Sequence, residues 1–208
     1  MNEVYRAGYL FFRRIAYSHY GYRVVNPERL IEEGSAIIAA NHASFLDPPM
    51  IGVAFQKELY YLARKTLFKN PFFGWLYAKW NSIPVDQQRP DMTSLKTMIR
   101  LLKEGHRVLI FPEGERTFEG ELGSGLPGVG LLVAKSRAPV LPVRIFGTSE
   151  ALPRGARLLR PAKIRVVVGE KLEFSADELA SRDKGNYQHI SDRIMAEIAK
   201  LELPEDLR

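Results

Sequence analysis

Residues 36–48 of the chain read Ala36-Ile37-Ile38-Ala39-Ala40-Asn41-His42-Ala43-Ser44-Phe45-Leu46-Asp47-Pro48. The first five form a short apolar run, which is typical of a buried strand. A histidine and an aspartate follow five positions apart, and a proline pair at 48–49 suits the first turn of a helix. The stretch therefore predicts a buried strand, a loop that carries His42, and a helix over about 48–55 with Asp47 at its start.

The rest of the chain continues this alternation of strands and helices. Further strands are expected at about 58–63, 82–85, 107–111, 139–146 and 163–169. Helices are expected at 3–20, 66–80, 91–104, 127–136 and near the C-terminus, where Tyr187, Ile190, Ile194 and Ile198 share one face. The pattern predicts an α/β class: a mixed, largely parallel sheet flanked by helices, with an N-terminal helical segment. At 208 residues, one domain over 1–208 is expected.

Composition narrows the classes of function. The chain has 30 Lys+Arg against 24 Asp+Glu, a net charge of +6, which favours an anionic partner such as a membrane surface, nucleic acid or a phosphorylated substrate. The basic residues are dispersed, so nucleic acid is not expected. The absence of cysteine excludes disulfides, thiolate metal sites and an acyl-cysteine intermediate. No apolar run approaches the ~20 residues of a spanning helix.

The spacing of His42 and Asp47 leaves two interpretations open. Residues five apart do not share a helix face, so the two side chains can meet only if the chain turns between them. If they meet, the carboxylate orients the imidazole and the histidine is a general base. Alternatively, Asp47 or Ser44 caps the helix and His42 packs under the loop.

Three further blocks follow in order along the chain. Taken singly, the Arg64-Lys65 pair and Arg116 are more typical of solvated surface cations than of phosphate ligands. The blocks are Ala63-Arg64-Lys65-Thr66-Leu67-Phe68 with Pro71, Gly74 and Ile83-Pro84-Val85-Asp86; Phe111-Pro112-Glu113-Gly114-Glu115-Arg116-Thr117; and Ala138-Pro139-Val140-Leu141-Pro142-Val143. With the first block, N-H-x-S-x-x-D-P at 41–48, they make a core over 35–150 that resembles the glycerolipid acyltransferases, in particular the 1-acylglycerol-3-phosphate (lysophosphatidic acid) acyltransferases.

The resemblance implies transfer of a fatty acyl group from acyl-CoA or acyl carrier protein to a lysophospholipid hydroxyl, without a cofactor and without a metal. His42 would be the base on that hydroxyl, and Asp47 would orient and stabilise it. Residues implied to bind the acceptor are Lys65, Arg89 and Arg116 at its phosphate, with Glu113 and Gly114 shaping the site.

Three positions depart from the family pattern around the implied phosphate site. Glu115 stands where a neutral residue is common, Gln87 replaces an arginine, and Leu126 replaces a basic residue. Arg89 lies two residues after Gln87 and would substitute for the missing arginine. The departures leave the His–Asp pair untouched, so a different lysophospholipid acceptor is the alternative to lysophosphatidic acid.

A membrane-resident acceptor implies a docking face. The helix within 1–22 combines aromatic and basic residues, which suits either an interfacial helix or packing against the sheet. The aromatic residues of 68–80 allow the same two interpretations. The expectation is a peripheral protein on the cytoplasmic side of the membrane, held by hydrophobic insertion and basic charge.

Other motifs support rival functions only weakly. Residues 123–128 match G-x-G-x-x-G, but they lie about a dozen residues past a strand and include Pro127, unlike a dinucleotide fingerprint. Gly147-Thr148-Ser149-Glu150-Ala151 is a degenerate nucleophile elbow that would make Ser149 an esterase nucleophile, with only His189 following it. A non-catalytic protein that binds anionic lipid is the remaining rival.

Overall fold

The structure is a computed structural model that describes residues 1–86, 92–117, 121–156, 158–181 and 183–207. The described residues form a seven-stranded sheet in the order β1-β7-β6-β2-β5-β3-β4. Its strands are β1 (Arg23–Val25), β2 (Ala36–Ala40), β3 (Tyr60–Arg64), β4 (Ser82–Val85), β5 (Arg107–Ile110), β6 (Val140–Phe146) and β7 (Arg165–Val168). All neighbouring strands are parallel except β6 and β7, which are antiparallel. The expected α/β class with a mixed, largely parallel sheet is confirmed.

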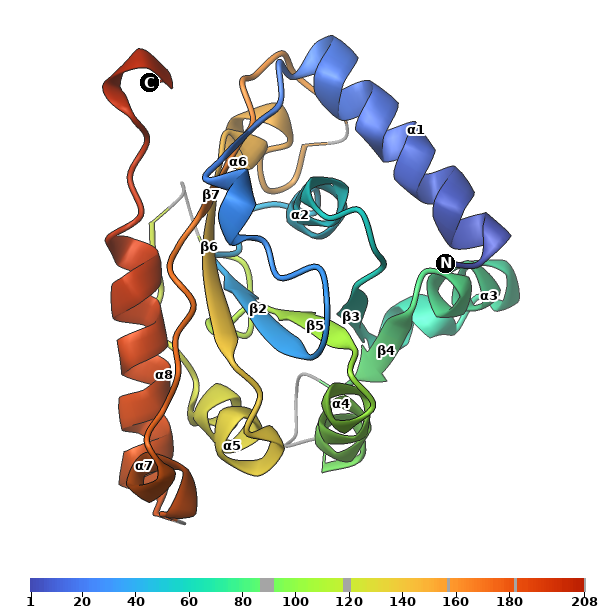
Figure 1. Ribbon diagram of the computed structural model, residues 1–208. Coiled ribbons are helices and arrows are strands. Elements are labelled where there is room, and N and C mark those ends of the chain that lie inside the picture. Colours follow the sequence, from blue (N-terminus) through green and yellow to red (C-terminus); the bar gives the residue numbers. More distant parts are fainter. Residues whose placement is uncertain (87–91, 118–120, 157, 182, 208) are drawn as a thin grey trace.

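Helices cover both faces of this sheet (Figure 1). The α-helices are α1 (Glu3–His19), α2 (Asp47–Ala54), α3 (Pro71–Lys79), α4 (Met92–Lys103), α5 (Pro127–Ser136), α6 (Thr148–Ala151), α7 (Ala176–Ala180) and α8 (Lys184–Ala199). Short 3-10 turns are η1 (Pro27–Arg29), η2 (Lys65–Phe68) and η3 (Glu205–Leu207). Helices α4, α5 and α8 lie on one face, and α1 and α2 lie on the other.

The central strand β2 is buried on both sides because it separates two hydrophobic clusters. Ile38 and its neighbours at alternate positions pack with α1 and α2, and Ile37 and Ala39 pack with α4, α5 and α8. This two-sided burial explains why 36–40 is apolar throughout instead of alternating with polar residues. The paired strands also end together: β2, β5, β3, β4 and β6 are parallel, so their carboxyl ends meet at one edge of the sheet.

The helix expected over 66–80 is two elements in the structure, so this prediction was wrong in its extent. Asn70 interrupts it, and its side chain accepts from the backbone N–H groups of Phe72 and Phe73 to cap α3. The strand β1 was not predicted from the sequence. It has only three residues and pairs solely with β7, so it leaves no clear periodicity.

The two aromatic helices each leave apolar side chains in solvent. On α1, Tyr5 and Ala16 are buried, while Leu10, Phe11 and Tyr17 are more than half exposed. On α3 no residue is buried, and Phe72, Phe73 and Trp75 are at least half exposed. Packing into the core therefore does not account for these side chains. Within the described part of the chain, no helix is both long enough and apolar enough to cross a bilayer.

Candidate active site

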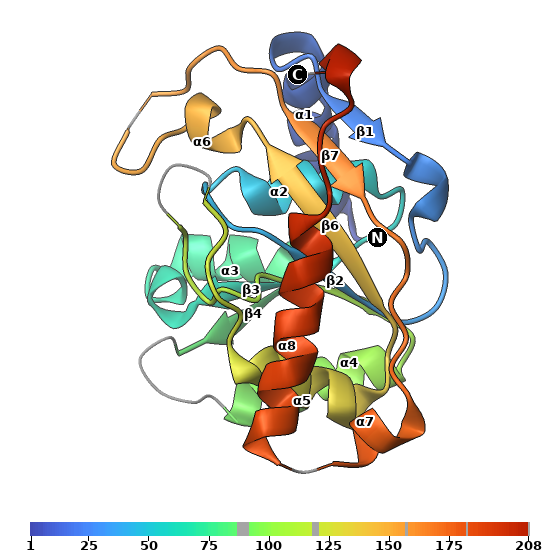
Figure 2. The same cartoon turned by 90° about the vertical axis from the view of Figure 1, so that its left-hand side faces the viewer.

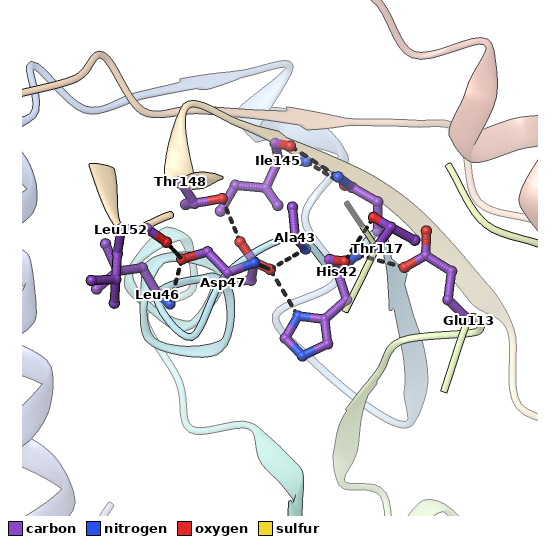
Figure 3. Close-up of polar contacts among 11 residues, drawn as sticks. His42, Ala43, Leu46, Asp47, Glu113, Thr117, Ile145, Thr148 and Leu152 are labelled. Carbon is purple, nitrogen blue, oxygen red and sulfur yellow. Dashed lines mark hydrogen bonds and ion pairs between the residues drawn. The ribbon is translucent and has the colours of Figure 1, made fainter. Parts of the chain in front are cut away.

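His42 and Asp47 meet at the carboxyl end of β2, as the turn between them was expected to allow (Figure 3). The ring nitrogen Nδ1 of His42 lies 2.8 Å from Oδ2 of Asp47. A carboxylate only accepts hydrogen bonds, so Nδ1 carries the proton and Nε2 of the neutral ring is an acceptor. That second nitrogen points away from Asp47, where it can take a proton from a ligand.

Asp47 is fully buried, and both of its oxygens accept hydrogen bonds. Oδ2 accepts from the backbone N–H groups of Ala43 and Ser44, each at 2.7 Å, as well as from the imidazole. Oδ1 accepts from the hydroxyl of Thr148. These donors compensate for the burial of the negative charge. Three of the donors lie in the loop before α2, and the fourth, Thr148, lies on α6. The oxygens of Asp47 are thus occupied by donors outside the first turn of α2, and α2 has no side-chain cap, so the interpretation of Asp47 as the helix cap is wrong. The hydroxyl of Ser44 accepts from the N–H of Leu46 at 3.3 Å.

Residues of the block at 111–117 hold the backbone of His42 through hydrogen bonds. Its N–H donates to Oε2 of Glu113 at 2.7 Å. Its carbonyl accepts from the N–H of Thr117 at 2.8 Å and from the Thr117 hydroxyl at 3.1 Å. The ring of Phe111 stacks on the imidazole at 4.0 Å between centroids. The loops after β2 and β5 therefore form one rigid unit around the imidazole.

Each carboxylate oxygen of Glu113 accepts a hydrogen bond from a backbone N–H group. Its Oε1 accepts from the N–H of Gly123 at 3.0 Å, while Oε2 holds His42. Burial raises the pKa of Glu113, and the two backbone donors partly oppose this rise. Glu113 was expected to shape the acceptor site. Its hydrogen bonds join the backbone of His42 to that of Gly123, so it positions the loop that carries the histidine. Gly123, part of the G-x-G-x-x-G match, is used to close the loop over this carboxylate.

Gly114 continues this turn in a left-handed conformation with φ +75°. This backbone conformation favours glycine, and a β-carbon there would also meet Cδ1 of Leu126, the end of a flexible side chain. The side chain of Leu126 thus lies directly over the turn that joins Glu113 to Arg116.

The expected phosphate ligands lie in different settings. The guanidinium of Arg116 lies 3.7 Å from the ring centroid of Phe45, within the His42 loop. Burial lowers the pKa of Arg116, and the positive charges of Arg154 and Arg64 lower it further. The negative charge of Asp47 acts on the same guanidinium in the opposite direction and raises its pKa. Lys65 is exposed at the start of η2, and Arg89 lies outside the described residues.

Comparisons with known proteins agree with this geometry. A family model described as Acyltransferase matches residues 21–146. The chain is 34% identical over 156 residues to a 1-acyl-sn-glycerol-3-phosphate acyltransferase of Bacillus subtilis, covering 73% of this chain and 74% of that one. It is 32% identical over 151 residues to a protein of the same name from Pseudomonas aeruginosa, covering 71% of this chain and 58% of that one. The crystal structure of the 1-acyl-sn-glycerophosphate (LPA) acyltransferase PlsC from Thermotoga maritima matches with a TM-score of 0.70 and 26% identity, over 97% of this chain and 80% of that one.

The chain belongs to the acyltransferase family. It is an O-acyltransferase, and the resemblance seen in its four sequence blocks is confirmed.

Several residues of this acyltransferase site were not singled out from sequence. Thr148 was noticed only as part of the degenerate elbow, yet it hydrogen-bonds to Asp47. Asn41 exchanges two hydrogen bonds with the backbone of Ile145 and so joins the end of β2 to that of β6. Thr117 belongs to a recognised block, but its hydrogen bonds to the histidine carbonyl depend on the fold.

The esterase interpretation of the acyltransferase's Gly147–Ala151 segment is not supported. The hydroxyl of Ser149 donates to Glu150 at 3.2 Å. His189 is exposed on α8, which covers the opposite face of the sheet from α2. The segment instead supplies Thr148 to the His–Asp pair.

Proposed function

We propose that this acyltransferase moves a fatty acyl group from acyl-CoA or acyl carrier protein to the free hydroxyl of lysophosphatidic acid, making phosphatidic acid for phospholipid synthesis. The observation that carries the proposal is the His42–Asp47 hydrogen bond, which leaves Nε2 of the imidazole available as a base in the loop where Arg116 packs on Phe45. The names of the relatives support the choice of acceptor.

In the proposed reaction, the proton of the acceptor hydroxyl passes through the imidazole of His42 to the leaving thiolate. Nε2 of His42 takes the acceptor's hydroxyl proton while the hydroxyl oxygen attacks the thioester carbonyl. Asp47 stabilises the imidazolium through Nδ1. When the tetrahedral intermediate collapses, the C–S bond breaks and the imidazolium proton goes to the departing thiolate. The products are the ester and a free thiol, and no enzyme nucleophile or cofactor takes part.

Positive charge beside the base provides a place for the acceptor's phosphate. Arg116 is held against Phe45 within the catalytic loop, and Arg64 lies close enough to affect its pKa. We assign the phosphate to Arg116 and Lys65, with Arg89 as a further ligand. Arg116→Ala should mainly raise the KM for the acceptor, and an unchanged KM would remove Arg116 from this role.

The acceptor's location implies action at a membrane surface. We propose peripheral binding on the cytoplasmic side, through the exposed aromatic residues of α1 and α3 and the net charge of +6. Phe11 on α1 and Phe72 on α3 are among the most exposed large apolar side chains of the described residues.

The central test follows free thiol released from acyl-CoA, and separately from acyl carrier protein, with lysophosphatidic acid as acceptor. His42→Ala and Asp47→Ala should each abolish turnover, because one removes the base and the other its orienting charge. Ser149→Ala and His189→Ala are matched controls and should remain active. Substantial turnover by the His42 variant would refute the assigned base. A panel of other lysophospholipids tests the alternative acceptor, which the negative charge of Glu115, next to Arg116 in the sequence, would favour.

A further inference from the structure

Two consecutive leucines project into solvent from the loop that joins α6 to β7, residues 152–164. Leu158 is 80% exposed and Leu159 is 53% exposed, although both are among the most apolar side chains in proteins. Leu158 has the largest exposed fraction among the large apolar side chains of the described residues. Neither the fold nor the catalytic site described above uses this pair.

The α6–β7 loop is fixed at its base. The N–H of Arg160 donates to the carbonyl of Ala151 at 2.8 Å, which brings the two arms of the loop together. A tight turn is closed by the N–H of Ala156 and the carbonyl of Pro153 at 3.0 Å. The hydroxyl of Ser44 donates to the carbonyl of Leu152 at 3.0 Å. The leucine pair is thereby attached to the same loop that carries His42.

The charged residues of the α6–β7 loop are all basic. Residues 152–164 contain four basic residues and no acidic residue. Of these, Arg154, Arg160 and Lys163 are exposed. An exposed apolar pair flanked in the sequence by basic residues fits the boundary of an anionic bilayer, where the leucines contact acyl chains and the basic groups contact lipid phosphates.

The loop also lies on the side of the molecule where the active site is. In Figure 2 the α6–β7 loop and α3 both project toward the left-hand side, and α2 lies between them. Helix α3, which carries the exposed Phe72, Phe73 and Trp75, therefore lies on the same side of the molecule as this loop. His42 belongs to the loop that leads into α2, which lies between these two elements.

We propose that Leu158 and Leu159 insert into the surface of an anionic bilayer and, together with α3, point the active site at the lipid. Arg154, Arg160 and Lys163 lie at the level of the headgroups. The inference rests on the proposed function for its purpose, but lipid insertion can be measured without turnover.

The first test uses the absence of cysteine in the chain. Leu158→Cys introduces a single thiol that can carry an environment-sensitive fluorophore, and Lys135→Cys on the exposed surface of α5 is the matched control site. With vesicles of phosphatidylglycerol and phosphatidylcholine, the label at 158 should shift to shorter wavelength and brighten, and the label at 135 should not. An unchanged label at 158 on vesicles that bind the protein overturns the proposal. A response to soluble acyl carrier protein without lipid also overturns it.

The second test separates docking from chemistry. Leu158→Ser combined with Leu159→Ser should weaken vesicle binding roughly ten-fold or more, because two apolar side chains no longer enter the bilayer. The variant should turn over a short-chain, monomeric lysophosphatidic acid like the wild type, and lose activity only on vesicle-borne acceptor. Equal loss on both acceptors would make the leucines part of the active site and overturn the proposal. If the wild type shows lipid insertion but transfers no acyl group, the proposed function fails and the docking inference stands.

Discussion

The environment of Asp47 determines what this carboxylate can do. Its two oxygens accept from one imidazole, two backbone amides and one hydroxyl, and the side chain has no contact with solvent. It is therefore placed to orient His42 and to stabilise the positive charge formed on it, and not to contact substrate.

Asp47→Asn tests this arrangement while keeping the shape of the side chain. The amide has one acceptor oxygen, so its NH2 group must face either Thr148 or the N–H groups around Oδ2. We expect kcat to fall by roughly 10²–10⁴ and stability to fall by about 1–3 kcal/mol for the mismatched donor. Thr148→Ser keeps the hydroxyl donor and should retain most activity. A fully active Asn variant would show that the carboxylate charge is not needed.

Glu113→Gln is a second test at the catalytic loop. Both carboxylate oxygens accept from backbone N–H groups, those of His42 and Gly123. Glutamine can satisfy only one of them, so the loop that carries the base should loosen. We expect a lower kcat with little change in acceptor KM, measured by thiol release. A rise in acceptor KM alone would instead place Glu113 in contact with the substrate.

The same variant should change how stability depends on pH. Burial raises the pKa of Glu113 in the folded protein above its ordinary value. The folded state holds this proton more tightly, so the group contributes stability below its ordinary pKa, and this contribution is lost as the pH rises through the raised pKa. Urea unfolding should show the wild type losing stability relative to Glu113→Gln as the pH rises through that window. A constant difference between the two proteins would contradict the raised pKa.

The residues of the site differ in how far sequence could identify them. His42 and Asp47 are close in sequence and a proline pair sets the turn between them, so their contact could be predicted. Thr148 meets Asp47 across 101 positions. Only the parallel pairing of β2 with β6 brings these two strand ends together. A single sequence does not specify which strands are neighbours. A residue such as Thr148, which reaches the site only through strand pairing, therefore could not be identified from sequence.

Among the elements, α5 and α8 show how close packing depends on a small residue. A β-carbon at Gly130 would lie within 2.8 Å of three backbone atoms of Tyr187 on α8. Gly130→Ala should therefore cost about 1–3 kcal/mol, because the two helices must move apart. Gly128 lies on the same helix with open space around it, so Gly128→Ala should stabilise the protein by up to about 1 kcal/mol. Thermal unfolding of both variants checks the pair, and equal Tm values would contradict it.

The predicted and observed boundaries of helices and strands agree where residues such as proline mark the ends of an element. The helix predicted at 127–136 and the strand at 82–85 have those bounds in the structure, because Pro127 and a short extended run mark their limits. The expected single helix over 66–80 failed because the Asn70 cap favours a new start at Pro71. An apolar pattern shows that a segment is helical, whereas capping decides where the helix begins.

At the scale of the whole molecule, net charge and exposed apolar side chains act together. The charge of +6 alone could not distinguish a membrane from a phosphorylated soluble ligand. The exposed aromatic residues of α3 and the leucine pair of the α6–β7 loop favour the membrane, since they have no role in binding a small anion. Attraction to anionic lipid is screened by salt, whereas apolar insertion is not.

These two contributions predict a specific response to ionic strength. Lipid-phosphate attraction is worth about 1 kcal/mol per basic side chain near the surface, and the Debye length falls from about 10 Å at 0.1 M salt to about 3 Å at 1 M. Binding to anionic vesicles, measured by sedimentation, should therefore weaken strongly over that range and then level off at the affinity for phosphatidylcholine alone. Turnover of a monomeric short-chain acceptor should fall much less, because only the contacts of the proposed phosphate ligands Arg116, Lys65 and Arg89 are screened. Vesicle binding that ignored salt would mean that apolar insertion alone holds the protein, and that the basic residues around Leu158 and Leu159 serve another ligand.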